Sequence, residues 1–332
     1  MSENRASLKT LLVAASLAAT ACAGQSADTT TTVAPTSTVA DTTTTAAAAT
    51  AITETSAFPV MIESGGVSTM IEATPMAIVS LSPTATEMLF AVGAGDQVVA
   101  VDEYSYHPPE APVTDLSGFT PNLEAIVAFE PDLVVVSDDL DGIVSALAGV
   151  GVPTLVLPAA SEIADAYEQV RVVGRATGHV EDAEQVAASM EAQIEALLAG
   201  VDPSDEPLTY YHELGSDGGG SFYSVTSSTF IGEVFGAFGL ENIADPADAD
   251  GFGYPVLSVE FIIEADPDLI FYTSCCGDTP QSISARPGWD SISAVQSGAL
   301  TELDDDVASR WGPRLVQFFE VVAVAIEDRT SG

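Results

Sequence analysis

Basic residues are almost missing from this chain. It holds 8 lysines and arginines against 49 aspartates and glutamates, and Lys9 is its only lysine. Proteins that bind nucleic acid contact phosphates through basic side chains, so nucleic acid is not expected as a partner. A polyanionic small ligand is also disfavoured unless the few arginines gather at its site. The excess of carboxylates predicts a solvated, strongly negative surface that suits a salty environment.

Histidine is scarce as well, with 3 in the chain. His179 falls in a predicted helical connection, while His107 and His212 are the two that we place near a binding cleft. A bare metal ion usually takes several histidine and carboxylate ligands, so we expect no metal site, although these two could supply part of one. The motifs His-Glu-x-x-His, Gly-x-Ser-x-Gly and the P-loop are absent, so we expect neither an enzyme nor a cofactor.

Cysteine is limited to Cys22, Cys275 and Cys276. The last two are neighbours that follow a predicted strand. An exported protein meets oxidising conditions, so we expect Cys275 and Cys276 to form a disulfide in a tight loop, although a bond between neighbours is strained. Free thiols and a two-thiol metal site are the alternatives, and the spacing does not match known zinc motifs.

The first 57 residues have the pattern of an export and anchoring segment. Basic residues precede an apolar stretch that ends at Ala21, which predicts a signal peptide over residues 1–21. The small residues directly before Cys22 resemble the lipobox of bacterial lipoproteins, which implies cleavage before Cys22 and lipidation of its thiol. An ordinary secretory signal is the alternative. Residues 22–57 are rich in threonine and alanine and predict a disordered tether.

One segment of the chain occurs twice. LEAIVAFEPDLVVVS spans residues 123–137, and VEFIIEADPDLIFYT spans residues 259–273. Each copy predicts a short helix that begins after a capping residue, Asn122 or Ser258, and ends at a proline before a buried strand. The repeat indicates two similar α/β lobes, and a cleft between lobes is where a ligand binds. A chance likeness of two helix–strand units is the alternative.

The other apolar runs complete the two lobes. We expect an N-terminal lobe over 58–160, a connecting helix over 161–178 and a C-terminal lobe over 179–330. The individual elements that we expect are a hairpin at 58–73, strands at 77–81, 98–101, 154–157 and 208–214, and helices at 84–92, 143–148, 230–238 and from 312 onward, with a second long helix after residue 178.

Several motifs resemble the ABC-transporter substrate-binding proteins of the iron-siderophore/vitamin B12 type. The motifs are Ile78–Ala111, NLEAIVAFEPDLVV, ARPGWDSISAVQSGAL and SRWGPRLVQFFE, and the likeness covers about Phe58 to Ile326. The resemblance implies two α/β lobes joined by one long rigid helix, with a ligand in the cleft and delivery to a permease and its ATPase subunits. The N-terminal lobe is most similar to the vitamin B12-binding branch, whereas the Cys275–Cys276 pair and the acidic surface are not general features of that branch.

The candidate ligand-binding residues are polar or aromatic and follow predicted strands or precede helices. An aromatic ring can stack on a large ligand, and polar groups at strand-to-helix turns point toward the cleft of an α/β lobe. For Ser82 and Thr84 helix capping is the alternative, and for Tyr104 it is capping of the sheet. For Trp311 the alternative is packing, and for Arg310 it is pairing with a neighbouring aspartate. The candidates are Ser82, Thr84, Tyr104, Ser137, Asp138, Phe222, Tyr223, Tyr254, Ser274, Arg310 and Trp311.

Glu124 and Glu260 occupy equivalent places in the two copies of the repeat. Each lies in the first turn of a predicted helix, where a carboxylate complements the helix dipole. The resemblance implies a second role, in which one glutamate on each lobe engages the permease. We therefore expect a monomeric, lipid-anchored, extracytoplasmic binding protein for a metal chelate, a corrinoid first and a ferric siderophore or haem second. An extracellular enzyme and a structural surface protein are the alternatives from other classes.

Overall fold

The computed structural model describes residues 58–201, 206–273 and 277–331. All of these residues belong to one compact unit. The predicted signal peptide, Cys22 and the tether lie outside the described residues, and so do Ser274, Cys275 and Cys276. No helix in the described ranges combines the length and the apolar character that crossing a membrane requires.

The N-terminal lobe is built on a parallel sheet of five strands in the order β5-β4-β3-β6-β7. Strand β3 lies at the centre of the sheet. Strands β4 and β5 lie on one side of it, and β6 and β7 lie on the other. The strands are β3 Ile78–Leu81, β4 Val98–Asp102, β5 Val113–Leu116, β6 Leu133–Val136 and β7 Thr154–Val156. The apolar runs of β3, β6 and β7 are completely buried because helices cover both faces of the sheet.

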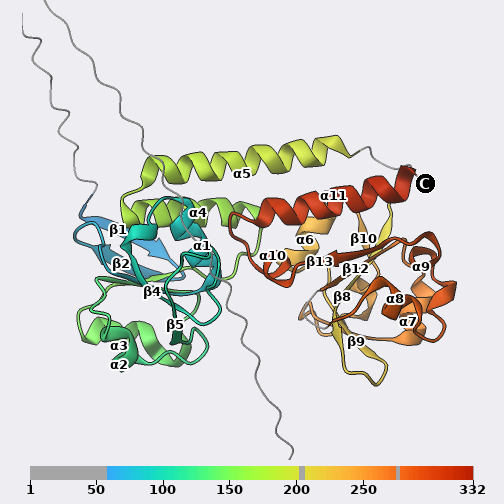
Figure 1. Cartoon of the computed structure of the whole chain (residues 1–332), viewed down its shortest axis with the longest axis horizontal. Helices are drawn as coiled ribbons and strands as arrows, with labels where there is room; N and C mark the ends of the chain where they lie inside the picture. The colour runs from blue at the N-terminus through green and yellow to red at the C-terminus, as the bar shows by residue number, and fades with distance from the viewer. Residues whose placement is uncertain (1–57, 202–205, 274–276, 332) are drawn as a thin grey trace, which may run out of the picture. The chain divides into compact units, whose positions relative to one another are not determined.

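Successive residues of these strands pack against different helices. Ile78 and Val135 join the cluster under α1 and α4, whereas Val79 and Val134 join the cluster over α2 and α3. Figure 1 places α1 and α4 on one side of this sheet and α2 and α3 on the other. The helices are α1 Pro83–Ala91, α2 Leu123–Val127, α3 Ile143–Gly149 and α4 Ile163–Thr177.

The predicted hairpin at the start of the lobe is confirmed. It consists of β1 Val60–Ser64 and β2 Val67–Ile71, paired in antiparallel fashion around Gly65 and Gly66. The hairpin covers the outer strand β7, because the Ser64 hydroxyl donates to the Val156 carbonyl and the Thr69 hydroxyl to the Thr154 carbonyl, each at 2.6 Å. These bonds use backbone acceptors that an edge strand would otherwise expose.

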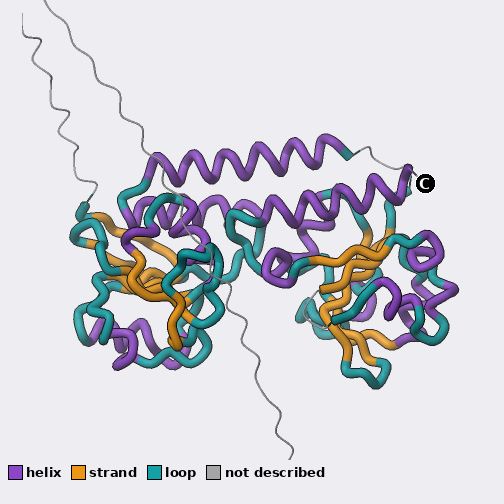
Figure 2. The backbone as a smooth tube through the Cα atoms, viewed as in Figure 1, coloured by secondary structure: helices purple, strands orange, loops and turns teal. Residues whose placement is uncertain are grey.

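The C-terminal lobe has a mixed sheet in the order β11-β9-β8-β12-β13, with β10 paired to β8. Strands β8, β12 and β13 are parallel to one another, and β9 runs antiparallel to β8. The strands are β8 Thr209–Ser216, β9 Ser221–Ser224, β10 Glu241–Asn242, β11 Val256–Ser258, β12 Leu269–Thr273 and β13 Leu300–Leu303. The helices are α6 Phe230–Ala237, α7 Val259–Ala265, α8 Pro280–Ser284, α9 Ser293–Ser297, α10 Asp305–Ser309 and α11 Leu315–Ser331. Figure 2 shows that in each lobe the strands gather between helices.

The repeat in the sequence is also a repeat in the structure. Asn122 and Ser258 accept from backbone amides at the starts of α2 and α7, at 3.0 and 3.2 Å. Glu130, three residues after the end of α2, and Asp266, which caps the end of α7, both have left-handed backbone conformations, with φ of 51° and 46°. Because side chains rarely adopt this conformation, its recurrence at matched positions makes chance likeness a poor explanation.

The aspartate of each Pro-Asp-Leu triplet performs the same task in both lobes. The Asp132 carboxylate accepts from the amides of Met76 and Ala77 at 2.8 and 3.0 Å, directly before β3. The Asp268 carboxylate accepts from the amide and hydroxyl of Thr209 at 3.1 Å, at the start of β8. Each aspartate therefore ties the beginning of its own strand to the beginning of the neighbouring strand.

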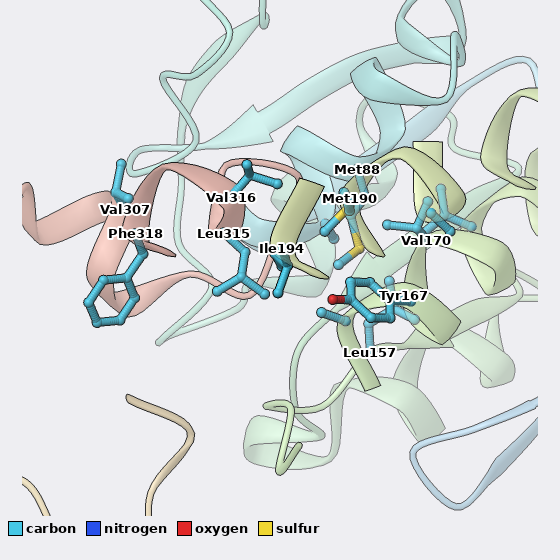
Figure 3. Packing of buried hydrophobic residues seen from close by; sticks show 14 of the residues in the cluster. Met88, Leu157, Tyr167, Val170, Met190, Ile194, Val307, Leu315, Val316 and Phe318 are labelled. Atoms are coloured by element: carbon cyan, nitrogen blue, oxygen red, sulfur yellow. The ribbon is translucent and has the colours of Figure 1, made fainter. Parts of the chain in front are cut away.

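Long helices carry the chain from one lobe to the other. The connecting helix predicted over 161–178 is α4, and the second long helix is α5, Val180–Gly200. The two pack against each other, and α11 packs against α5. One buried apolar cluster includes Met88 of α1, Tyr167 of α4, Ile194 of α5 and Phe318 of α11, so it joins both sheets (Figure 3). The lobe boundaries at 160 and 178 stay a prediction.

The differences from the predicted elements concern short or half-exposed segments. Strands β5, β9, β10, β11 and β13 and helices α8, α9 and α10 are absent from the sequence prediction, and α11 begins at Leu315 rather than near Gly312. Strand β5, for example, has only one buried residue, Leu116. Edge strands of this kind lack the continuous apolar run that predicts a central strand.

Candidate ligand-binding site

The N-terminal candidates gather at one edge of their sheet. Strand β3 pairs in parallel with β4 and β6, so the carboxyl ends of the three strands lie together. Ser82, the loop after Asp102, and Ser137 follow these ends. In open α/β sheets a ligand binds at this edge, where strand order reverses, and here the reversal is at β3.

Ser82 and Thr84 belong to the start of helix α1. The Ser82 hydroxyl accepts from the Ala85 amide at 3.3 Å, so the capping alternative is confirmed for Ser82. Ser82 and Thr84 are both buried. Ser137 is half-buried and Asp138 is exposed, which leaves both accessible at the edge of the sheet. Ser82 and Thr84 are therefore structural residues of this edge, whereas Ser137 and Asp138 are accessible to a ligand.

An exposed aromatic pair is the most prominent feature of this edge. Tyr104 follows β4 and is 48% exposed, and Phe119 follows β5 and is 72% exposed. Their rings meet edge to face with centroids 5.7 Å apart. Exposed rings at a sheet edge offer apolar area without a charge. Sequence reasoning missed Phe119 because strand β5 was not predicted, and the Ser-Gly turn before it was the available signal.

Exposed aromatic residues also lie on or directly before the outer strands of the C-terminal lobe. Tyr223 on β9 is 47% exposed and pairs across the sheet with Val256 of β11. Phe252 and Tyr254 precede β11, are 76% and 48% exposed, and have ring centroids 5.7 Å apart. Tyr223 and Tyr254 are therefore accessible, as expected, and Phe252 was missed.

Phe222, a predicted ligand contact, is buried and therefore not accessible. It lies in β9, is 5% exposed, and its ring is 5.4 Å from that of Trp289. Adjacent residues of a strand face opposite sides of the sheet, so one of Phe222 and Tyr223 had to be buried. Without β9 in the prediction, this alternation could not be applied.

Arg310 is the centre of a buried ion-pair cluster instead of a free ligand contact. It is 7% exposed, and its guanidinium lies 3.0 Å from the Glu87 carboxylate and 2.5 Å from that of Asp306. Arg314 binds the same Glu87 carboxylate at 2.6 and 2.9 Å. The alternative in which Arg310 pairs with a neighbouring aspartate is confirmed. Glu87 was missed, although it is the single charge in the apolar helix α1.

Trp311 is mainly a packing residue. It is half-buried, its indole N–H donates to the Gln169 side-chain oxygen at 2.9 Å, and its ring contacts Phe230 edge to face at 6.4 Å. Gln169 in turn donates to the Pro158 carbonyl at 2.8 Å. These contacts connect the segment before α11 with α4 and with the end of the N-terminal lobe, which supports the packing alternative for Trp311.

A second arginine cluster involves strand β8, through the half-buried Arg286. Arg286 binds the Glu213 carboxylate at 2.6 and 2.8 Å and the Asp278 carboxylate at 3.1 Å. Its guanidinium lies over the rings of Trp289 and Phe222 at 4.5 and 5.0 Å, a cation–π arrangement. Ser274, Cys275 and Cys276 precede Asp278 in the chain but lie outside the described residues. The ligand contact of Ser274 and the disulfide between Cys275 and Cys276 therefore stay predictions.

The histidines are not arranged as a metal site. His212 lies in β8, is completely buried, and packs against Phe235 at 5.5 Å, so its expected place in the cleft is wrong. His107 is half-buried in the loop after β4. Within the described ranges, no three histidine, cysteine or acidic side chains come together in a way that could hold a metal ion.

Several hollows lie away from these residues, with volumes of about 470 to 630 Å³. The one of about 630 Å³ is bounded by β2, the end of α3 and the residues before β7. None of the predicted ligand residues lines it. We therefore assign the candidate site from the aromatic and polar side chains at the carboxyl ends of the strands.

The sequence and the fold agree with a known family. A family model described as periplasmic binding protein matches residues 78–307. The chain belongs to this family. Its members are solute-binding proteins and not enzymes, and the resemblance identified in the sequence is confirmed.

Three relatives illustrate the likeness. The uncharacterized ABC transporter substrate-binding lipoprotein YvrC of Bacillus subtilis is 29% identical over 282 residues, which cover 82% of this chain and 87% of that protein. The cobalamin-binding protein of Halobacterium salinarum is 28% identical over 286 residues, with coverages of 82% and 76%. The solved structure of the periplasmic heme-binding protein RhuT from Roseiflexus sp. RS-1 has a TM-score of 0.66 and 25% identity, with coverages of 77% and 99%.

Proposed function

We propose that this protein is the extracytoplasmic substrate-binding lipoprotein of an ABC importer and that its ligand is a corrinoid such as cobalamin. Membership of the periplasmic binding protein family supports the binding role. The similarity to an ABC transporter substrate-binding lipoprotein and to a cobalamin-binding protein supports the importer and the ligand. The partners would be a permease and its ATPase subunits, with Cys22 as the lipid anchor of a monomer.

The pairing of the arginines is the observation that favours a corrinoid over an anionic chelate. Every arginine of the described residues has a carboxylate partner, and these residues contain no lysine. Haem carboxylates and the acidic groups of siderophores need cationic or strong hydrogen-bond donors when they leave water. A near-neutral ligand has no such requirement. A ferric siderophore or haem is the rival ligand from the same family.

The exposed aromatic residues supply the contacts that a large, nearly neutral ligand requires. Tyr104 and Phe119 belong to one lobe, and Tyr223, Phe252 and Tyr254 to the other. Each ring can contribute apolar contact and stacking with about 0.5–1.5 kcal/mol beyond its buried area. An extracellular enzyme and a structural surface protein are less well supported, because the family consists of binding proteins.

Calorimetry and absorption spectroscopy on the mature protein test this proposal. Cyanocobalamin, haem and a ferric hydroxamate siderophore are titrated separately, and the protein purified from its own host is examined for bound colour. We expect heat with cyanocobalamin and weaker binding of Phe119→Ala, by about two- to tenfold. Phe129→Ala is the control, since Phe129 is an exposed aromatic residue at the other end of α2. Binding of the siderophore without binding of cyanocobalamin would contradict the corrinoid.

We also propose that Glu124 and Glu260 contact the permease. Both are exposed in the first turns of α2 and α7, and neither has an ion-pair partner within the described ranges. Unpaired carboxylates on matched helices can meet basic pockets and set orientation and association rate. Replacing both by alanine is expected to abolish uptake while ligand affinity stays unchanged. A control variant lacking the exposed Glu181 and Glu320 loses the same charge and is expected to transport normally.

A further inference from the structure

The segment of the C-terminal lobe that precedes α11 holds the loop carrying Tyr104. One guanidinium nitrogen of Arg310 donates to the Tyr104 carbonyl at 3.3 Å. The same guanidinium lies 5.4 Å from the centre of the Tyr106 ring. The neighbouring Asp306 carboxylate raises the pKa of Tyr106. The loop after β4 is thus contacted by side chains more than two hundred positions away in the sequence.

The loop after β4 is also bound by residues of its own lobe. The Asp102 carboxylate accepts from the Tyr104 amide at 2.9 Å. The Ser105 hydroxyl bonds to that of Thr86 at 3.0 Å, and Thr86 bonds to Ser80 at 2.9 Å, all of them fully buried. The backbone at Tyr104 therefore has a partner on each side, the amide in its own lobe and the carbonyl in the other.

The side chain of Tyr104 remains exposed while its backbone is held. The ring is 48% exposed and contacts Phe119, whereas Arg310 is 7% exposed. A buried group that fixes a backbone while leaving a ring accessible reduces the ordering that a ligand would otherwise cause on binding. Resting on the proposed function, we propose that Arg310 is a positioning residue, through which the C-terminal lobe aims Tyr104 at the ligand.

Arg314 provides a matched comparison within the same cluster. Both arginines bind Glu87, which is 3% exposed. Only Arg310 reaches the Tyr104 carbonyl, Tyr106 and Asp306. Removing either arginine weakens the ion-pair cluster, but only the loss of Arg310 releases the loop. Loop ordering and general stability can therefore be separated experimentally.

The experiment compares Arg310→Lys, Arg314→Lys and Tyr106→Phe in the mature protein. Lysine keeps the charge but lacks the planar fork that reaches several partners at once. Hydrogen–deuterium exchange of peptides covering residues 102–110 is measured without ligand, and cyanocobalamin affinity is measured by calorimetry. We expect Arg310→Lys to speed exchange at Tyr104 and to weaken binding by about two- to tenfold, the effect of one misplaced stacking contact. Arg314→Lys is expected to lower the melting temperature with both readouts unchanged.

Tyr106→Phe keeps both arginines and tests the same loop if Arg310→Lys does not fold. It removes only the hydroxyl that interacts with Asp306 and Arg310, so faster exchange at residues 102–110 is expected with little change in melting temperature. Equal effects of Arg310→Lys and Arg314→Lys on exchange and affinity would overturn the positioning role, as would normal exchange in both Arg310→Lys and Tyr106→Phe. Wild-type protein that binds no cyanocobalamin would instead contradict the proposed function, while the exchange comparison would still decide the role of Arg310.

Discussion

His212 is a base enclosed by apolar side chains. Its imidazole is completely buried, and neither ring nitrogen has a hydrogen-bond partner among the described residues. Burial lowers its pKa to about 3, because the protonated ring would lose its hydration. The unfolded chain takes up a proton near the ordinary pKa of 6.5, whereas the folded chain does not. The native state is therefore weakened as pH falls from about 6.5 toward 3.

We predict that His212→Phe removes part of this pH dependence. Between pH 7.5 and 5 the wild-type protein should lose about 2 kcal/mol of unfolding free energy through this residue, and the variant should not. Urea denaturation at a series of pH values measures the difference between the two slopes. An equal pH dependence of unfolding free energy in wild type and variant would show that His212 is protonated as readily in the folded protein as in the unfolded chain.

A second residue-level prediction concerns Cys275 and Cys276. We expect an oxidised pair and therefore almost no reaction of unreduced, denatured mature protein with a thiol reagent. After reduction, the same protein should show both thiols, which serves as the control for reagent access. Two reactive thiols before reduction would support the free-thiol or metal-binding alternatives.

The exposure of single residues was the least predictable part of the site. Tyr104, Tyr223 and Tyr254 are accessible as expected, but Phe222 and His212 are buried and Phe119 and Phe252 were missed. Whether a strand residue faces solvent depends on its register and on the helix that covers it, and both are set by contacts far away in the chain. Arg310 posed a similar problem, because its partner Glu87 belongs to the other lobe.

At the level of elements, the repeated helix–strand unit was the most reliable guide. Its helices, strands and capping residues lie where the sequence predicts them, because capping and proline termination are local effects. The task of the repeated aspartate could not be predicted in the same way. Asp132 and Asp268 act on neighbouring strands that only the folded sheet brings together.

We predict that Asp132→Ala destabilises the N-terminal lobe. The change leaves the amides of Met76 and Ala77 without their carboxylate, and because the site is exposed the expected cost is about 1–2 kcal/mol. Chemical denaturation followed by circular dichroism measures it. Asp115→Ala is the control, since Asp115 is an exposed aspartate on β5, and its cost should stay within about 0.5 kcal/mol. Equal costs would mean that the strand-joining bonds contribute nothing.

The whole molecule combines a continuous core with a highly charged exterior. The apolar cluster through α1, α4, α5 and α11 extends into both sheets, so separation of the lobes would expose it. The formal net charge of −41 opposes compactness through repulsion among carboxylates. The charged exterior could be predicted from the composition of the sequence. The path of the apolar core from one lobe to the other could not, because it depends on how the helices pack.

We predict that salt stabilises the protein. Raising NaCl from about 0.05 to 1 M shortens the screening length from more than 10 Å to about 3 Å, which relieves carboxylate repulsion. Each kcal/mol of relief should raise the melting temperature by about 2–4 °C. Calorimetric melting in NaCl and in choline chloride of equal ionic strength should give similar gains. A melting temperature that is independent of salt would indicate that the surface charges are already neutralised.

The pairing of every described arginine also bears on how this protein could change during evolution. A shift in preference toward an anionic ligand would need a cation at the site, and each existing one already stabilises the fold through a carboxylate partner. Recruiting Arg286 would leave the buried Glu213 without its counter-ion, at a cost of about 3–5 kcal/mol, and recruiting Arg310 would leave the buried Glu87 with Arg314 alone. New specificity would therefore have to arise by gain of a basic residue, so descendants of this sequence with anionic ligands should carry additional lysines or arginines at the strand edges.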